Sequence, residues 1–135
     1  MNSSIHERIT TIRSSLPDSV RLIAVTKQVS TEVMRSAYAA GVRDFAESRI
    51  QEATSKQVEL QDLTGITWHF IGHLQSNKAK KALSQFTWIH SVDNLQLAQR
   101  LNQLAQELGV SPQVCLQVKI LLDPNKSGWS APQLL

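Results

Sequence analysis

Polar side chains that are capable of chemistry follow several short apolar runs in this sequence. Lys27 comes directly after the run RLIAVT, Glu47 and Ser48 follow VRDFA, and His73 follows ITWHFIG. A lysine amine attacks carbonyl groups, while histidine and carboxylate side chains transfer protons. These residue types predict a binding or catalytic site if the fold brings the ends of the runs together. Solvated loop residues are the alternative interpretation at this point.

A separate physical argument supports a chemical role for Lys27. It continues its apolar run at the same parity as Ile23 and Val25, so in a strand its side chain shares their direction. If these residues face the interior of a barrel, the amine lies over a dry, apolar floor. Desolvation then lowers the pKa of the lysine and leaves more free amine to attack a carbonyl group. A strand-end lysine that extends into water is the alternative.

The arguments for a functional role of the histidines are weaker. His69 lies inside the run ITWHFIG, where a hydrogen-bonded core residue is expected more often than a catalyst. His73 follows Gly72, whose lack of a side chain permits close backbone approach to a ligand. The i, i+4 spacing of His69 and His73 suits a metal only on a helix, and the single cysteine, Cys115, lies in a buried-type strand run. We therefore predict no metal site.

Alternating helix and strand patterns position these residues. Helices are predicted for residues 3–15 (N-cap Ser3 or Ser4), from about 30 to 41, 48–63, from about 76, and 94–109. Strands are predicted for residues 21–26, 42–46, 66–72, 86–92 and 113–122. The alternation predicts an α/β fold with a parallel sheet, either doubly wound or a (β/α)₈ barrel. Because a barrel needs about 200–250 residues, about three of its strands would be missing.

Composition limits the class of protein. With 135 residues, 41% hydrophobic and 19% charged, residues 1–135 are expected to form a single domain. No apolar run is long enough for a membrane helix, and a lone cysteine suits the reducing cytoplasm. The net charge of +3 includes one dense basic run, Lys78, Lys80 and Lys81. We interpret this run as a solvated helix face, with a weakly bound anion as the alternative, and expect no nucleic-acid partner.

Five segments resemble motifs of the YggS/PROSC family and occur in the same order. LIAVTK is similar to V-A-V-[ST]-K, FAESRIQEA to F-G-E-N-x-x-Q-E, and WHFIGHLQSNKAK to W-H-F-I-G-x-L-Q-x-N-K. SVD, and then QVKILLDPNKSGW, which resembles Q-V-N-x(5)-K-x-G, complete the series. Because the motifs span residues 22 to 129, the chain is identified as resembling this family over most of its length.

The resemblance implies a (β/α)₈ barrel of the TIM type, like the N-terminal domain of alanine racemase, of which this chain holds about the first five strands. It also implies that pyridoxal 5'-phosphate is held as a Schiff base on Lys27. Ser48, Ile71, Gly72 and His73 are implied to lie beside the cofactor. The family is regarded as a carrier or homeostasis factor for pyridoxal phosphate (vitamin B6), without an established catalytic activity.

The sequence departs from the family pattern in three respects. Ala46 and Ser48 replace the usual Gly and Asn, and Lys119 replaces an Asn. Family members also continue through three further βα units, which carry their phosphate-binding Ser/Thr and Gly-Arg segments. We therefore expect this chain to hold the lysine without the phosphate clamp, and to bind the cofactor weakly.

Two other functions remain open at this point. One is a racemase-like enzyme that depends on pyridoxal phosphate, which needs an acid or base on the opposite face of the cofactor ring. The other is a fragment without a function of its own, because an unclosed barrel exposes two sheet edges. We expect a monomer for a full-length family member, and self-association for the shorter chain.

Overall fold

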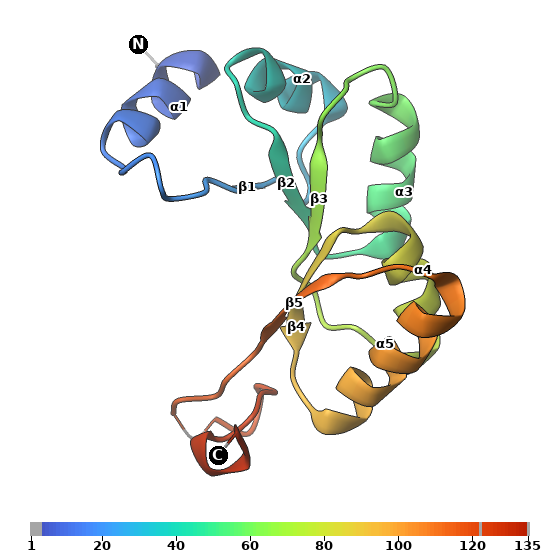
Figure 1. Ribbon diagram of the computed structural model, residues 1–135. Coiled ribbons are helices and arrows are strands. Elements are labelled where there is room, and N and C mark those ends of the chain that lie inside the picture. Colours follow the sequence, from blue (N-terminus) through green and yellow to red (C-terminus); the bar gives the residue numbers. More distant parts are fainter. Residues whose placement is uncertain (1–3, 122, 135) are drawn as a thin grey trace.

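A computed structural model describes residues 4–121 and 123–134 of the chain (Figure 1). Its elements follow in the order α1 (Ile5–Ser14), β1 (Ala24–Val25), α2 (Thr31–Ala39), β2 (Asp44–Glu47), α3 (Ile50–Glu59), β3 (Thr67–Phe70), η1 (Ser76–Lys78), α4 (Ala79–Gln85), β4 (Trp88–Val92), α5 (Leu95–Leu108), β5 (Gln113–Leu116) and α6 (Ala131–Leu134). The predicted alternation of strands and helices is therefore confirmed.

The strands form one parallel sheet in the order β1-β2-β3-β4-β5. Each strand is thus added beside the one that precedes it in the chain. In a doubly wound sheet the strand order reverses and helices cover both faces. Here α3, α4 and α5 lie along one side of the strands, and the other side is open (Figure 1). This winding is that of a (β/α)₈ barrel, and the chain supplies its first five strands.

Local signals in the sequence account for the helix ends. Ser4 caps α1 in a reciprocal capping box with Glu7, whereas Ser3 lies outside the described residues. Ser30 caps α2, and the side chain of Asn94 accepts a hydrogen bond at the start of α5. Gly109 ends α5 in the left-handed conformation, with φ of 67°. These caps fix where each helix enters and leaves the sheet.

Two apolar clusters fill the space between the sheet and the helices. The first joins α1 and α2 to the first strands and centres on Met34, Phe45 and Leu60. The second joins α3, α4 and α5 to β3 and β4, and includes Phe70 and Ile89. Because side chains alternate along a strand, the residues between these apolar ones face the opposite, open side of the sheet. That side becomes the interior when a barrel closes.

Several elements differ from the sequence predictions. β1 has two residues and β5 has four, although strands were predicted for residues 21–26 and 113–122. Residue 122 lies outside the described residues, and the preceding Ile120 and Leu121 are 90% and 79% exposed. A strand needs a partner, and within residues 4–121 and 123–134 β1 and β5 each pair with one neighbour only. Cys115 was expected in a buried run but is partly exposed, because no strand lies beyond β5 in the described part of the chain.

None of the helices in the described ranges has the length and apolar character needed to cross a membrane.

Candidate functional site

The turn that follows β1 holds Lys27 at its corner. Thr26 extends the strand by donating its N–H to the carbonyl of Ala46 (3.0 Å), and the N–H of Val29 closes the turn on the carbonyl of Thr26 (3.0 Å). Gln28 has φ of 61°, the positive value that a type II turn requires at its third position. Lys27 therefore occupies the second position of a tight turn, and its side chain is exposed.

A buried lysine secures this turn from the helix side. Lys56 on α3 donates from Nζ to the carbonyl of Thr26 (2.6 Å), to Oε1 of Glu47 (3.0 Å) and to Oε1 of Glu52 (2.9 Å). The hydroxyl of Thr26 donates to the other carboxylate oxygen of Glu47. The N–H of Gln28 donates to Glu52 (2.7 Å). The residue before Lys27 is thus bonded to Lys56 and Glu47 and the residue after it to Glu52, and Lys56 joins the two carboxylates.

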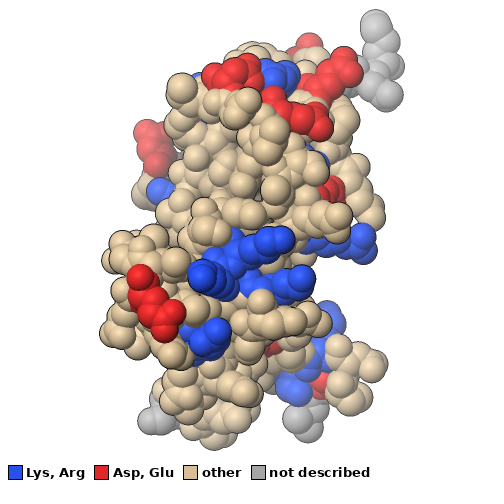
Figure 2. All heavy atoms as spheres, turned by 90° about the vertical axis from the view of Figure 1, so that its right-hand side faces the viewer, with Lys and Arg blue, Asp and Glu red and all other residues tan. Residues whose placement is uncertain are grey.

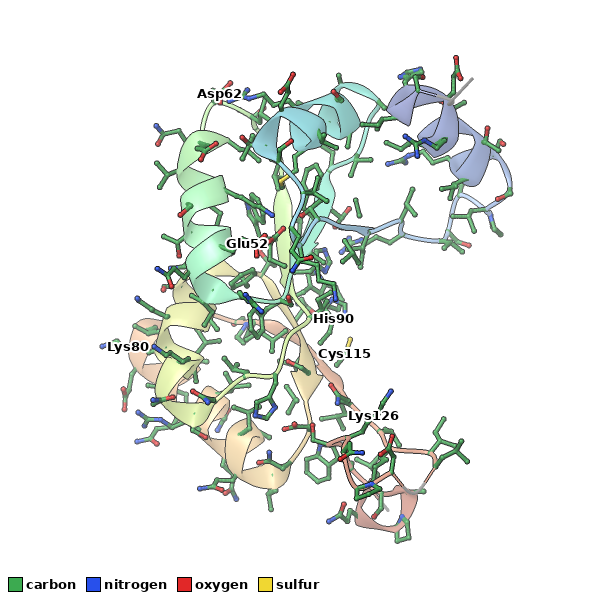
Figure 3. All side chains as sticks on the ribbon, turned by 180° about the vertical axis from the view of Figure 1, so that it is seen from behind. Glu52, Asp62, Lys80, His90, Cys115 and Lys126 are labelled. Atoms are coloured by element: carbon green, nitrogen blue, oxygen red, sulfur yellow. The ribbon has the colours of Figure 1, made fainter. Side chains whose placement is uncertain are left out.

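Burial and charge make this network strongly coupled. Glu47 is fully buried, and Lys56 is 7% exposed, so each charge depends on the other for stabilisation. The pKa of Glu52 lies below its ordinary value, chiefly because Lys56 donates a hydrogen bond to it and secondly because the backbone N–H of Gln28 does. Glu52 remains a carboxylate at neutral pH and keeps both bonds. Figure 3 shows Glu52 on α3, beside the strands.

Sequence reasoning missed Lys56. Among the residues of this helix, the apolar Val58 is 60% exposed and the charged Lys56 is buried. The spacing of Ala53, Lys56 and Leu60 is i, i+3 and i+7, which marks one face of a helix. A lysine on an apolar face is a signal for a buried ion pair, and two nearby carboxylates supply it here.

The surroundings of Lys27 correct one expectation. Val25, which shares the parity of Lys27, is 52% exposed, so the dry apolar floor predicted beneath the amine is not formed. The open inner face is the physical reason, since no strand beyond β5 lies opposite β1 among the described residues. Lys27 forms no ion pair with any described residue. Its amine is accessible rather than desolvated.

A layer of polar and aromatic side chains lies on the inner face of the strands. His69 is fully buried, with Nε2 at 2.8 Å from Oδ1 of Asp44 and Nδ1 at 2.9 Å from Nε2 of His90. Trp88 stacks against both imidazole rings, each at 5.7 Å between centroids. The guanidinium of Arg21 lies 5.6 Å from the Trp88 ring. His69 is therefore the hydrogen-bonded core residue that the sequence predicted.

The surroundings of His90 favour the neutral form of its imidazole. Burial lowers the pKa of His90, and the charge of His69 lowers it further. Because a carboxylate oxygen accepts, the Nε2–H of His69 donates to Asp44, and a second hydrogen bond joins Nδ1 of His69 to Nε2 of His90. In Figure 3, His90 and Cys115 both lie on the side of the strands away from α3, and hence on the open face.

Gly72 brings the loops after β2 and β3 together. A Cβ atom at this position would overlap the carbonyl oxygen of Ser48 and lie 2.8 Å from its carbonyl carbon. Only glycine fits, because the backbone of the neighbouring loop occupies the space of a side chain. The close approach at Gly72 in the structure is to the backbone of Ser48, and the approach to a ligand stays a prediction. Ile71 continues the ladder just before it, donating its N–H to the carbonyl of Glu47 (3.0 Å).

His73 leans toward the end of β4. Its Nδ1 lies 3.4 Å from Oδ2 of Asp93, and the imidazole is 64% exposed while the carboxylate is buried. Asp93 also accepts a hydrogen bond from Nδ2 of Asn94 (2.7 Å). The carboxyl ends of β3 and β4 are thus linked across the rim of the sheet.

The five residues implied to contact the cofactor separate into two environments. Ser48 and His73 line a cleft of about 780 Å³ between α3 and the segment that leads into α4. Lys27, Ile71 and Gly72 are not among the residues that line this cleft. All five lie at the carboxyl ends of β1, β2 and β3, the edge at which parallel α/β folds bind ligands.

Comparisons with known protein families and with curated proteins agree on the family of this chain. The alanine racemase N-terminal domain family matches residues 2–135. A pyridoxal phosphate homeostasis protein of Synechocystis sp. is 55% identical over 123 residues, covering 91% of this chain and 56% of that protein. One of Pseudomonas aeruginosa is 46% identical, covering 87% and 51%. The chain thus spans about half the length of these curated relatives.

Solved structures agree with this result. PipY of Synechococcus elongatus PCC7942 without PLP superposes with a TM-score of 0.93 at 57% identity, covering 97% of this chain and 61% of that one. The same protein with PLP bound superposes with a TM-score of 0.91, covering 97% and 60%. Alanine racemase of Clostridium difficile, at 17% identity and a TM-score of 0.69, shares the fold over 83% of this chain and 30% of that one.

Proposed function

Because the chain belongs to the alanine racemase N-terminal domain family, we propose that it takes part in pyridoxal 5'-phosphate homeostasis and holds the cofactor as a Schiff base on Lys27. One observation carries this proposal. Lys27 is an exposed lysine at the carboxyl end of β1, held at the corner of a turn whose flanking residues are bound to a buried ion pair. The names of the relatives support the choice of cofactor.

The residues of the chain fit the aldehyde end of the cofactor. The Lys27 amine is unpaired by any described carboxylate and accessible, so a carbonyl carbon can approach it. When bound, the cofactor would supply an electron-withdrawing ring conjugated to this nitrogen. Thr26 and Gln28 hold the backbone of the lysine, and Ser48, Ile71, Gly72 and His73 are proposed to border the ring. Lys56 orients the turn and does not itself reach the inner face.

We propose that the chain carries the cofactor without turnover and acts as a single cytoplasmic domain. The names of the relatives, which describe homeostasis rather than a reaction, support this choice over a racemase-like enzyme. We expect no conversion of L-alanine to D-alanine in a polarimetric assay with added pyridoxal phosphate. Racemisation that depends on Lys27 would instead favour the enzyme.

Borohydride reduction tests the anchor. We expect the 135-residue chain, incubated with millimolar pyridoxal phosphate and reduced, to carry the mass increment mainly on the peptide that contains Lys27. The Lys27→Ala variant should lose this adduct, and Lys80→Ala, which removes an exposed lysine on α4, should retain it. Without reduction the adduct should be lost on dilution, because binding is weak. Equal labelling of all lysines, or labelling unchanged in Lys27→Ala, would refute the assignment.

A further inference from the structure

The cleft that Ser48 and His73 line is also strongly basic. Arg49 at the start of α3, and Lys78 and Lys81 at the start of α4, border its volume of about 780 Å³. Figure 2 views the side on which α3 and α4 lie, and shows Lys and Arg side chains gathered at the middle of this face. Two lysines of the basic run that the sequence singled out, Lys78 and Lys81, thus lie on one wall of a cleft whose other wall belongs to α3.

The cations of the cleft are not neutralised by the protein. Arg49, Lys78 and Lys81 form no ion pair with any residue in the described ranges. Glu52 is the single carboxylate that lines the cleft, and it is bound by Lys56 and by the backbone N–H of Gln28. Like charges that converge on one cavity without partners raise the local concentration of anions.

The remaining lining adds polar donors and an apolar floor. Gln51 and Gln75 carry amide groups that donate hydrogen bonds, while Ile50, Phe70 and Leu74 supply apolar surface. A cavity of this size is in the range that small organic ligands occupy, and apolar lining with a few polar groups is typical of such sites. An inorganic ion would use the charges but leave the apolar floor uncovered.

We propose that this cleft binds a phosphorylated small molecule, with its phosphate against Arg49, Lys78 and Lys81 and its carbon skeleton against Ile50 and Leu74. The site differs from the proposed cofactor site in that Lys27, Ile71 and Gly72 do not line the cleft, although Ser48 and His73 belong to both. It requires no carbonyl group on the ligand and no covalent bond. The chain would thus have two adjacent ligand sites at the β2–β3 rim, one at Lys27 on the inner face and one on the helix side, with Ser48 and His73 between them.

Phenyl phosphate is a suitable probe, since it has a phosphate and a ring but no aldehyde. We expect it to bind the 135-residue chain with a millimolar or lower dissociation constant in a calorimetric or NMR titration, and more tightly than inorganic phosphate or phenol. Amide shifts should concentrate at residues 48–52 and 73–81.

Charge-removal variants separate a built site from general attraction to a basic protein. The Lys78→Gln/Lys81→Gln double variant should weaken phenyl phosphate binding about tenfold, because each lysine contributes a charge-assisted contact. The matched control Lys80→Gln/Lys126→Gln removes the same charge outside the cleft and should change affinity less than about twofold. Equal losses in the two variants, or no saturable binding at millimolar concentration, would overturn the proposal. Circular dichroism should show both variants folded, since all four lysines are exposed.

Lys27→Ala keeps this test distinct from that of the proposed function. We expect Lys27→Ala to bind phenyl phosphate as the unaltered chain does, although it loses the borohydride adduct. Loss of phenyl phosphate binding in Lys27→Ala would place the ligand at the inner face and refute a second site.

Discussion

Strands β2, β3 and β4 differ from β5 in what covers them. Phe45, Phe70 and Ile89 on the first three are at most 2% exposed, because α2 to α5 pack over them. Val114 and Leu116 on β5 are 46% and 49% exposed. Both sets of residues are apolar, and all belong to the same sheet. The difference teaches that in this fold a strand is stabilised by the helices and strands on either side of it, and that its own composition is not sufficient.

The residues around Lys27 and the polar layer also belong to the part of the chain in which helices cover the strands. The turn at Lys27 depends on β2 and α3, which lie within the covered part of the sheet. The polar layer of His69, Asp44 and His90 lies on the open face but is held between β2, β3 and β4. The turn at Lys27 and the polar layer are therefore built by the part of the chain that packs most completely, and β5 contributes little to them.

Replacing the buried lysine should have the largest effect. Lys56→Met leaves the carboxylate of Glu47 buried without its partner, so we expect the free energy of unfolding to fall by about 3–5 kcal/mol. Urea denaturation measures this change. Lys80→Met on the exposed side of α4 serves as the control and should change stability by about 0.5 kcal/mol or less. A double variant with Glu47→Gln should recover part of the loss, and its absence would show that the pair is not coupled.

Truncation of apolar residues tests the comparison directly. Ile89→Ala in β4 should lower the free energy of unfolding by about 3 kcal/mol, because it creates a cavity beneath α5. Leu116→Ala in β5 removes a side chain of similar size that is half exposed, and should cost about 1 kcal/mol. Both values come from the same urea titration. Equal losses would mean that β5 is covered in solution, for example by a second copy of the chain.

Substitutions at two glycines compare the cost of a steric overlap with the cost of an unfavourable backbone conformation. Gly72→Ala should cost about 2–3 kcal/mol, because the new methyl group meets the backbone of Ser48. In Gly109→Ala the added carbon has open space around it, and the only penalty is the left-handed φ. We expect the free energy of unfolding to fall by about 1 kcal/mol. Thermal unfolding of the two variants should reproduce this order. The reverse order would indicate that the loops after β2 and β3 move apart easily.

The smallest effect concerns pH. The folded state holds the pKa of Glu52 below the unfolded value, so its contribution to stability is complete above about pH 4.5 and is lost as pH falls through the folded pKa. The stability of the unaltered chain should therefore decline more steeply than that of Glu52→Gln as the pH falls below about 4.5. Parallel declines in urea titrations at each pH would show that the Glu52 carboxylate is not stabilised by Lys56 and Gln28.

The sequence predicted much of the architecture, and it placed Lys27 at the carboxyl end of the first strand. Helical spacing and cap residues located α1 and α5, and the order of the β and α patterns gave the parallel sheet. The ends of β1 and β5 were wrong because strand length depends on a neighbour, which a local pattern does not contain. Ile120 and Leu121 have strand propensity but nothing beside them to pair with among the described residues.

The network behind Lys27 could not be predicted in the same way. Hydropathy predicts that Lys56 is exposed to solvent. Its burial depends on ion pairs with Glu47 and Glu52, which only the tertiary fold brings close to it. Gln28 has no composition signal for a positive φ, which glycine or asparagine supplies more often. Its conformation follows from a carboxylate that accepts its N–H. Such features arise from the tertiary fold.

The type II turn at Lys27 has a consequence for the entropy of binding. Since the backbone on both sides of the lysine is already immobilised, a ligand that bonds to the amine restricts only the torsions of a four-carbon side chain. Lysine rotamers account for about 2 kcal/mol, whereas ordering a loose loop of four residues would cost about 4–8 kcal/mol more. This larger entropic cost is met when the chain folds. The backbone at Lys27 is therefore fixed before a ligand binds, and only the lysine side chain remains to be ordered.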